Sequence, residues 1–355
     1  MMWFPEYWKD KSRLVLFVTV KVAALVIAIV TALIISAGAA MTNDSTAQLA
    51  AGGLVLSRTD EIELMSEDLF VSAGQIHVDY VFRNLTNESV TTLVAFPMPD
   101  LSTPPDFSVD IPLDSANFLD FRTTVDGKPV VVNIEQRVKA LGIDRTDLLR
   151  SMEVPFEPQL EATLTALDQL PNDKQEELQN LGMLTFEVYY AGDVVTRHAR
   201  PLWTLSTIYY WSQVFAGNQE ISVSHSYKPS VGSSVQTFVG ADTASADDLS
   251  SYRQRYCMDR SFEQGAGKLQ NSLQNHGVLG EFRLEYILKT GANWGGGSIG
   301  KFRLVVDKGD PRNLVSFCMD NVRKISPTQF ETIHTDYFAE RNLEVLILKP
   351  VEFSP

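Results

Sequence analysis

The sequence predicts a mostly β protein: an antiparallel, β-sandwich-like fold with a helical insertion at about residues 142–182 and a second, partly helical segment at about 241–275. About a dozen short segments alternate apolar with polar residues, which is the period of a strand with one buried face. Few helices separate these segments and no strand–helix–strand rhythm is present. Antiparallel sheets are therefore favoured over a parallel, doubly wound sheet.

The first 39 residues are typical of a signal peptide. Basic residues between positions 9 and 21 precede an apolar run at 22–35, and the small residues at 36–40 supply an A-x-A cleavage site. We expect cleavage after Ala39, which leaves residues 40–355 as a single large mostly β domain, periplasmic or secreted. The apolar run is short for a bilayer span, but an uncleaved anchor over residues 14–35 is the alternative.

In the first half of the chain, strands are predicted where apolar residues occupy alternate positions. The clearest is 75–83, whose even positions are apolar. Asp126-Gly127 is a strong signal for a hairpin turn, because both residues tolerate positive φ. Residues 97–114, rich in Pro, Asp and Ser, are predicted to form a surface loop. The predicted strands are 53–58, 62–72 as one or two strands, 75–83, 90–96, 118–125 and 129–138.

The hydrophobic period becomes helical at residue 142. Leu160, Leu164 and Leu167 share one side of a helix, and Gly182 is typical of a helix end. We interpret this insertion as a structural cap on a sheet, with a mobile lid as the alternative. Further strands are predicted at 184–190, 203–215, 221–227, 282–288, 302–306, 315–318, 329–334 and 343–348, with a basic loop at 196–200 and a glycine-rich connection at 290–300.

The charge of the chain excludes some partners. The formal net charge is −14, and removing the four basic and two acidic residues of the leader leaves −16. An acidic surface repels nucleic-acid phosphates and anionic lipid. We therefore expect no nucleic acid, and no membrane contact after signal cleavage.

The two cysteines, Cys257 and Cys318, are predicted to form a disulfide, since an exported chain meets an oxidising compartment. A reactive thiol is the alternative, but no histidine lies near either cysteine in the sequence.

The stretch 203–232 contains the best hint of a site. It is predicted to form two strands joined as a hairpin by Gly217-Asn218, with Gln213 and His225 placed among aromatic residues. Aromatic faces beside an amide suit glycans or peptides, although the same alternation builds sandwich cores. The candidate ligand-binding residues are Tyr209, Trp211, Gln213, His225, Tyr227 and Trp294.

Other motifs do not carry chemistry. Residues 296–300 match G-x-S-x-G, but a strand rather than a helix is predicted after Ser298, so a nucleophile elbow is not expected. The same glycines lack the hydroxyl and the helix of a phosphate loop. His77-x-Asp79 and His334-x-Asp336 are explained by solvated strand faces. We predict no metal and no cofactor.

Several blocks of the mature chain resemble an exported domain-of-unknown-function family of Gram-negative bacteria. They are NDSTAQLAAGGL at 43–54, SEDL at 66–69, VAFPMPD at 94–100, the YYWSQVF to HSYKPSVG block, and TGANW at 290–294. The resemblance covers nearly all of the mature chain and implies a cleaved signal peptide and an envelope or secreted location. It implies no activity, cofactor or catalytic residue.

Three functional hypotheses follow. The first is a non-catalytic binding or assembly module of the envelope that recognises a glycan, a peptide or a partner protein. The second is an envelope hydrolase with a His225-centred site. The third is a purely structural protein.

Overall fold

The computed structural model describes residues 44–50, 53–102, 108–110, 117–191, 194–241, 244–274 and 276–353. The chain divides into two compact units, Met1–Ala40 and Met41–Pro355. The predicted signal peptide lies outside the described residues, as do 103–107 and 111–116 of the predicted loop. The sections below concern the second unit.

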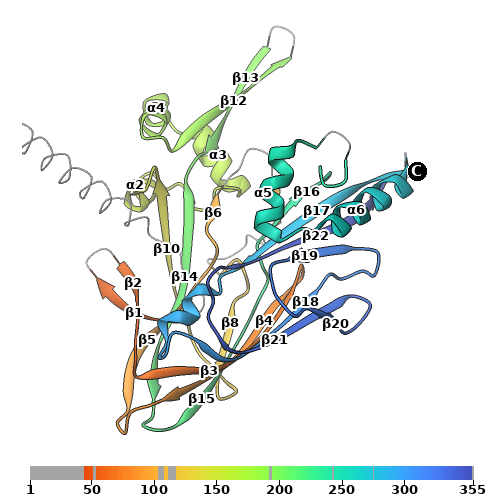
Figure 1. Cartoon of the computed structure of the whole chain (residues 1–355). Coiled ribbons are helices and arrows are strands. Elements are labelled where there is room, and N and C mark those ends of the chain that lie inside the picture. The colour runs from red at the N-terminus through yellow and green to blue at the C-terminus, as the bar shows by residue number, and fades with distance from the viewer. Residues whose placement is uncertain are drawn as a thin grey trace, which may run out of the picture. The chain divides into compact units, whose positions relative to one another are not determined.

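Within the described residues the strands form four sheets, so the fold is mostly β as predicted (Figure 1). Sheet A is built around β14, which pairs with β10 on one side and with β5 and β6 on the other, all antiparallel. Its strands are, in spatial order, β11 (Ile143–Asp144), β10 (Asn133–Ala140), β14 (Thr204–Phe215), β5 (Val90–Pro97), β1 (Ser45–Ala50) and β2 (Gly53–Ser57), with β6 (Leu101–Ser102) beside β14.

Sheet B faces sheet A. Its strand β3 is continuous, with an irregular register between Leu64 and Ser66 rather than a break. The pairing of β3 with β18 is parallel, in contrast to the antiparallel pairs around it. The strands are β20 (Arg323–Lys324), β21 (Gln329–Tyr337), β18 (Ile299–Asp307), β3 (Ile62–Ser72), β4 (Ile76–Asn84), β15 (Glu220–Tyr227), β8 (Arg122–Val125) and β9 (Lys128–Pro129).

Sheet C extends the core and carries helices on its other face. One face of β17 and β22 contributes Leu284, Tyr286 and Ile347 to the main core. The other face packs Leu346 and Leu348 against residues of α5 (Ala246–Tyr256) and α6 (Arg260–Leu273), the partly helical segment predicted at 241–275. The strands are β19 (Leu314–Phe317), β22 (Leu343–Glu352), β17 (Gly277–Tyr286), β16 (Val231–Ser234) and β7 (Ser108–Asp110).

The predicted helical insertion is present. It contains α2 (Thr146–Ser151), α3 (Glu161–Gln169) and α4 (Asn172–Asn180), and Gly182 follows at a φ of 68°. Leu167 and Leu178 are fully buried on the inner side of α3 and α4. The apolar stripe read from the sequence therefore packs on neighbouring strands.

The predicted hairpin at 203–227 is wrong, although both of its strands form. β14 belongs to sheet A and β15 to sheet B, so the two strands face each other across the sandwich instead of pairing. The connection is tight: a Cβ on Gly217 would lie 2.2 Å from the carbonyl oxygen of Asn87. Two facing strands bury both of their apolar faces in one core, which pairing within a single sheet would not achieve.

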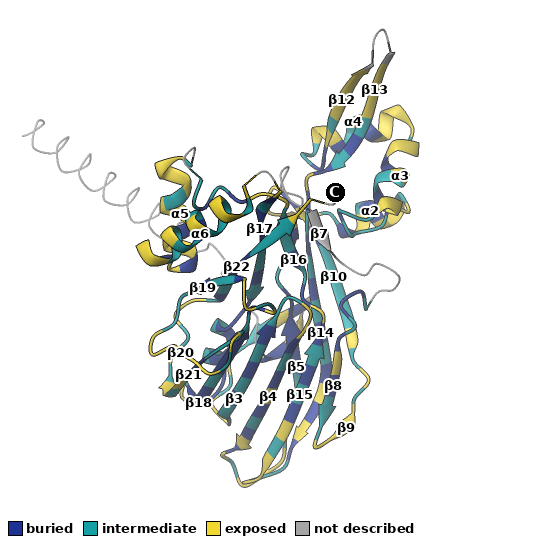
Figure 2. Ribbon diagram, turned by 90° about the vertical axis from the view of Figure 1, so that its right-hand side faces the viewer, coloured by how far each residue is buried: buried dark blue, intermediate teal, exposed yellow. Residues whose placement is uncertain are grey.

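The predicted basic loop at 196–200 is also wrong. It lies inside β13 (Val194–Pro201), which pairs along its length with β12 (Leu184–Ala191) in two-stranded sheet D. Its alternation was hidden because Arg197, His198 and Arg200 lie close together within it. Figures 1 and 2 show β12 and β13 extending beyond the other sheets of the unit.

The predicted disulfide is present. Cys257 ends α5 in the left-handed region, at a φ of 52°, and is bonded to Cys318 just after β19, with the two Cα atoms 5.0 Å apart. The bond ties the outer helical layer to sheet C.

Candidate functional site

The six predicted ligand-binding residues lie inside the core. Tyr209, Trp211 and Gln213 reach it from β14, His225 and Tyr227 from β15, and Trp294 from the glycine-rich connection. The most exposed is Gln213, at 8%. Alternation correctly placed them on inward faces, and the facing sheets bring them together. In this conformation their side chains are shielded from any ligand in solution.

His225 is paired with an acid that the sequence analysis did not single out. Its Nε2 lies 3.1 Å from both carboxylate oxygens of Asp44, and both side chains are fully buried. Rings of Phe96, Phe121 and Trp211 surround the imidazole at centroid distances of 4.9 to 5.5 Å. A hydrolase would require an accessible imidazole, whereas this one is sealed from solvent.

Burial raises the pKa of the Asp44 carboxyl, and the charge and hydrogen bond of His225 pull it back in part. The pair therefore holds a polar group inside an aromatic core at the beginning of β1. Such a pair is more typical of a structural anchor than of a solvent-facing catalytic group.

The TGANW block completes this anchor. Residues 289–293 form the 3₁₀ turn η1 (Lys289–Asn293), and Trp294 follows with its ring in the core. The Trp294 Nε1–H donates to the Asp44 carbonyl at 2.5 Å, and the Asn293 amide donates to the Ser45 hydroxyl at 2.9 Å. The glycine-rich connection thus fastens the beginning of the described chain to the sandwich.

A second buried acid lies between sheets B and C. The hydroxyls of Tyr80 and Tyr286 are 2.7 Å apart, and Tyr286 donates to Glu67 at 3.1 Å. Burial raises the pKa of both tyrosines, and the nearby Glu67 charge raises it further. Both phenols therefore stay neutral and link two sheets. Glu67 could have been found from the sequence, because it alternates with Leu69 and Val71 on β3.

The other motifs lie on strands or directly beside them. Ser298 is followed by strand β18, not by a helix. His77 contacts Asp79 at 3.0 Å on an exposed face, and His334 bonds Thr332. In the part of the chain that the structure describes, no cluster of three metal-ligating side chains is found. None of the helices in the described ranges has the length and apolarity of a bilayer span.

Sheet D carries an exposed feature that the sequence analysis missed. We call residues 184–201 the arm. Its outer half exposes Val188 by 44%, Tyr189 by 52%, Tyr190 by 76% and Val195 by 59% (Figure 2). Tyr190 pairs with Val195 across the strands, so these two side chains and Val188 share one face. Among the described residues, neither β12 nor β13 has a second strand neighbour.

The inner half of the arm is held firmly by the helical insertion. Asp168 of α3 accepts the Ala199 amide at 2.7 Å and lies 2.8 Å from the Nδ1 of His198. Burial opposes ionisation of Asp168, but these two hydrogen bonds together with the charges of His198 and Arg200 outweigh it and lower its pKa. The Arg197 guanidinium stacks 3.9 Å from the Phe186 ring centroid. The inner half of the arm is therefore attached to the helical insertion, whereas its outer half is exposed.

A groove of about 500 Å³ runs beside the arm. It is lined from α3 by Glu161, Leu164, Thr165 and Asp168, and from the arm by Tyr189, His198 and Arg200. The His198–Asp168 pair orients an imidazole, but no nucleophilic side chain is hydrogen-bonded to it within the described residues.

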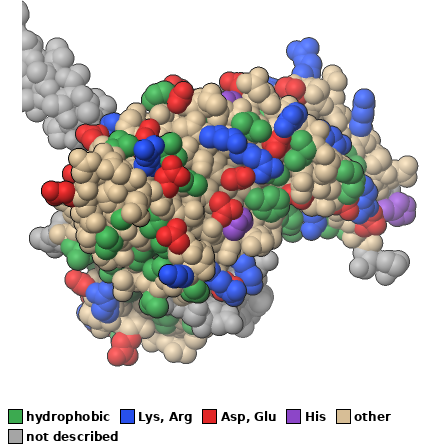
Figure 3. All heavy atoms as spheres, turned by 90° about the horizontal axis from the view of Figure 1, so that it is seen from below, with side chains coloured by type: hydrophobic (Ala, Val, Ile, Leu, Met, Phe, Trp, Pro, Cys, Tyr) green, Lys and Arg blue, Asp and Glu red, His purple; other side chains and the backbone are tan. Residues whose placement is uncertain are grey.

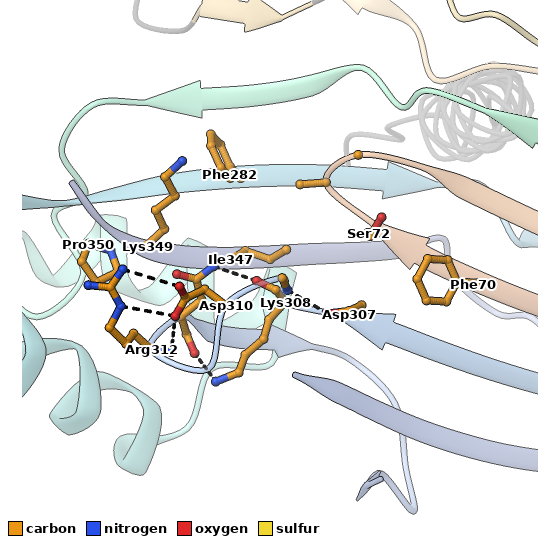
Figure 4. A pocket seen from close by; sticks show the side chains of 14 residues that line it. Phe70, Ser72, Phe282, Asp307, Lys308, Asp310, Arg312, Ile347, Lys349 and Pro350 are labelled. Atoms are coloured by element: carbon orange, nitrogen blue, oxygen red, sulfur yellow. Dashed lines mark hydrogen bonds and ion pairs between the residues drawn. The ribbon is translucent and has the colours of Figure 1, made fainter. Parts of the chain in front are cut away.

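A separate cavity of about 500 Å³ lies where sheets B and C meet (Figure 4). Its wall is formed by the turn between β3 and β4, the loop 307–313 after β18, and strands β17 and β22.

On the face shown in Figure 3, acidic and basic side chains are interspersed, without a patch of a single sign.

Comparisons with known proteins leave the activity open. A model of one protein family, described as a domain of unknown function, matches residues 42–346. No curated protein matches the sequence. A crystal structure from Legionella pneumophila, of a protein for which nutrient binding has been suggested, is similar at 15% identity and a TM-score of 0.40, covering 86% of this chain and 70% of that one.

Proposed function

Because the chain belongs to the family Domain of unknown function (DUF4424), whose description names no activity, we propose its function from the geometry: an exported, non-catalytic binding module that docks a partner protein through the arm. The observation that carries this proposal is the outer half of the arm. Tyr190 is 76% exposed and lies directly opposite Val195, which is 59% exposed, on a two-stranded sheet.

Isolated two-stranded hairpins are only marginally stable in water, and their open edges invite a further strand. Here α3 contacts β13 and α4 contacts β12, so the inner half of the arm is packed against the helical insertion. A partner that adds an extended segment to one edge would satisfy the backbone groups of that edge and place its own side chains beside Tyr190 or Val195. Tyrosines in this position are typical anchors of protein interfaces.

The charges beside the arm define the chemistry of the partner. Helices α3 and α4 carry five acidic residues, Glu161, Asp168, Asp173, Glu176 and Glu177, against one lysine, Lys174. The basic residues of the arm are engaged: Arg200 with Glu187, His198 with Asp168, and Arg197 with the Gln175 side chain. The proposed partner is therefore an extended apolar protein segment flanked by lysine or arginine. An anionic membrane surface is disfavoured by the same acids.

Export is part of the proposal. The leader pattern of residues 1–39 and the Cys257–Cys318 bond both support it, since disulfides persist mainly in oxidising compartments. N-terminal sequencing of the protein recovered from the envelope is expected to begin at Ala40. An intact leader would instead support the anchor over residues 14–35.

Docking is tested with fluorescent peptides of alternating Val and Thr, flanked by lysines in one version and by glutamates in the other. Anisotropy should show saturable binding of the lysine version. The double change Tyr190→Ser, Val195→Ser should weaken this binding at least about tenfold, the size expected when interface anchors are lost. The matched control is Val131→Ser, which alters an apolar residue that is 92% exposed and lies outside the arm.

Three outcomes would count against docking of such a segment. The first is equal binding of both peptides, which would remove the role of charge. The second is self-association in sedimentation velocity that the double variant abolishes, which would make a second copy the partner. The third is binding to phosphatidylglycerol vesicles that is lost in the double variant, which would make the arm a membrane contact.

A further inference from the structure

The cavity between sheets B and C is independent of the arm and has a chemistry of its own. Its apolar lining is continuous with the main hydrophobic core. Phe282 of β17 pairs with Ile347 of β22, and Phe70 of β3 approaches from sheet B. Ile347 is fully buried, whereas both phenyl rings are partly exposed. In Figure 4 the Phe282 ring lies beside Lys349, and Phe70 lies at the other end of the lining residues.

Lys349 places a positive charge beside this apolar lining. Lys349 lies two residues beyond Ile347 on β22, hence on the same face. Its ammonium nitrogen is 4.7 Å from the centroid of the Phe282 ring, which is cation–π distance. Lys349 makes no ion pair with any described residue, in a chain whose formal net charge is −14.

The other charged groups of the cavity are already engaged by the loop 307–313. The Lys308 ammonium donates to the carbonyls of Pro311, at 2.8 Å, and of Asn313. Asp310 is paired with Arg312, as Figure 4 shows. Asp307 accepts hydrogen bonds from Gly309 and Gln329. Lys349 is therefore the cation best placed to meet a ligand.

We propose that this cavity binds a small amphipathic carboxylate, with its anionic group on Lys349 and its apolar body on Phe282 and Ile347. About 500 Å³ is within the usual size of small-molecule sites, which combine an apolar lining with few polar groups. A neutral sugar would leave the ammonium unused, and a cationic ligand would be repelled by it.

The probes are decanoate and decylamine, which share a ten-carbon chain and differ in charge. Calorimetry below their micelle concentrations, on the full protein as purified, should show one decanoate site. Decylamine should bind about tenfold more weakly or worse. Lys349→Gln should weaken decanoate about tenfold, the loss expected for a charge-assisted contact, and leave decylamine unchanged or stronger.

The matched control is Lys324→Gln, because the Lys324 ammonium also lies over a phenyl ring, that of Phe330, at 6.0 Å but outside the cavity. It should leave decanoate binding unchanged. A second variant, Ala73→Trp, places a large ring in the wall of the cavity and should abolish binding while the thermal midpoint is kept. A peptide, N-acetyl-Leu-Phe, tests whether a peptide carboxyl terminus binds more tightly than the alkyl acid.

The proposal is overturned if decanoate shows no saturable binding, if decylamine binds equally well, or if Lys349→Gln and Lys324→Gln have the same effect. None of these results concerns the arm, so the two proposals stand or fall separately.

Discussion

Replacing His225 by leucine tests the buried pair that anchors the beginning of β1. The change removes the imidazole that lies 3.1 Å from the Asp44 carboxylate and leaves that acid in the core. Removing the hydrogen-bond partner of a buried polar group typically costs about 1–3 kcal/mol, and more when the remaining group is charged. We expect His225→Leu to lower the free energy of unfolding at pH 7 by about that amount.

The pH dependence separates electrostatics from packing. The pKa of Asp44 is raised above 3.8 in the folded protein, so between 3.8 and the folded value the folded state holds a proton that the unfolded state releases. Stability from this group is therefore lost as pH rises through that window. Without His225 the folded pKa rises further, so the destabilisation should be larger at pH 7 than at pH 4.5.

Denaturant unfolding followed by tryptophan fluorescence provides the assay, because Trp203, Trp211 and Trp294 are all fully buried. His225→Gln keeps an N–H donor toward Asp44 and should lose less stability than the leucine variant. Equal losses at both pH values, or equal losses in both variants, would refute an electrostatic role and leave only the packing of the imidazole.

Two further predictions concern covalent and backbone constraints. Replacing both Cys257 and Cys318 by serine should lower the free energy of unfolding by about 4 kcal/mol on the chain-entropy model, given a sequence separation of 61, and an unchanged denaturation midpoint would contradict this. Gly217→Ala should lower the free energy of unfolding by about 1–3 kcal/mol, because its Cβ would lie 2.2 Å from the Asn87 carbonyl oxygen. The control Gly74→Ala, whose Cβ would have no atom within 4 Å, should be near neutral. Equal thermal midpoints for the two variants would contradict this reasoning.

Local sequence patterns predicted most strands because they record which side of each segment is buried. The alternation on β4 and β14 identified inward residues that the structure buries. It failed for β13, where a basic run conceals a strand whose partner supplies most of the apolar surface. It also could not show that β14 and β15 lie in different sheets, because a strand presents the same period whichever neighbour it pairs with.

The sequence by itself determined the fold class, the helical insertion, the cysteine pair and the inward placement of Trp211 and His225. Only the tertiary structure decided what those inward residues meet: Asp44, 181 positions away from His225, closes over the imidazole and turns a candidate site into a sealed core. The tertiary structure also decided which side chains stay exposed to solvent: those on the outer half of the arm and those in the cavity around Lys349. Exposure depends on contacts between distant segments, and no local period encodes it.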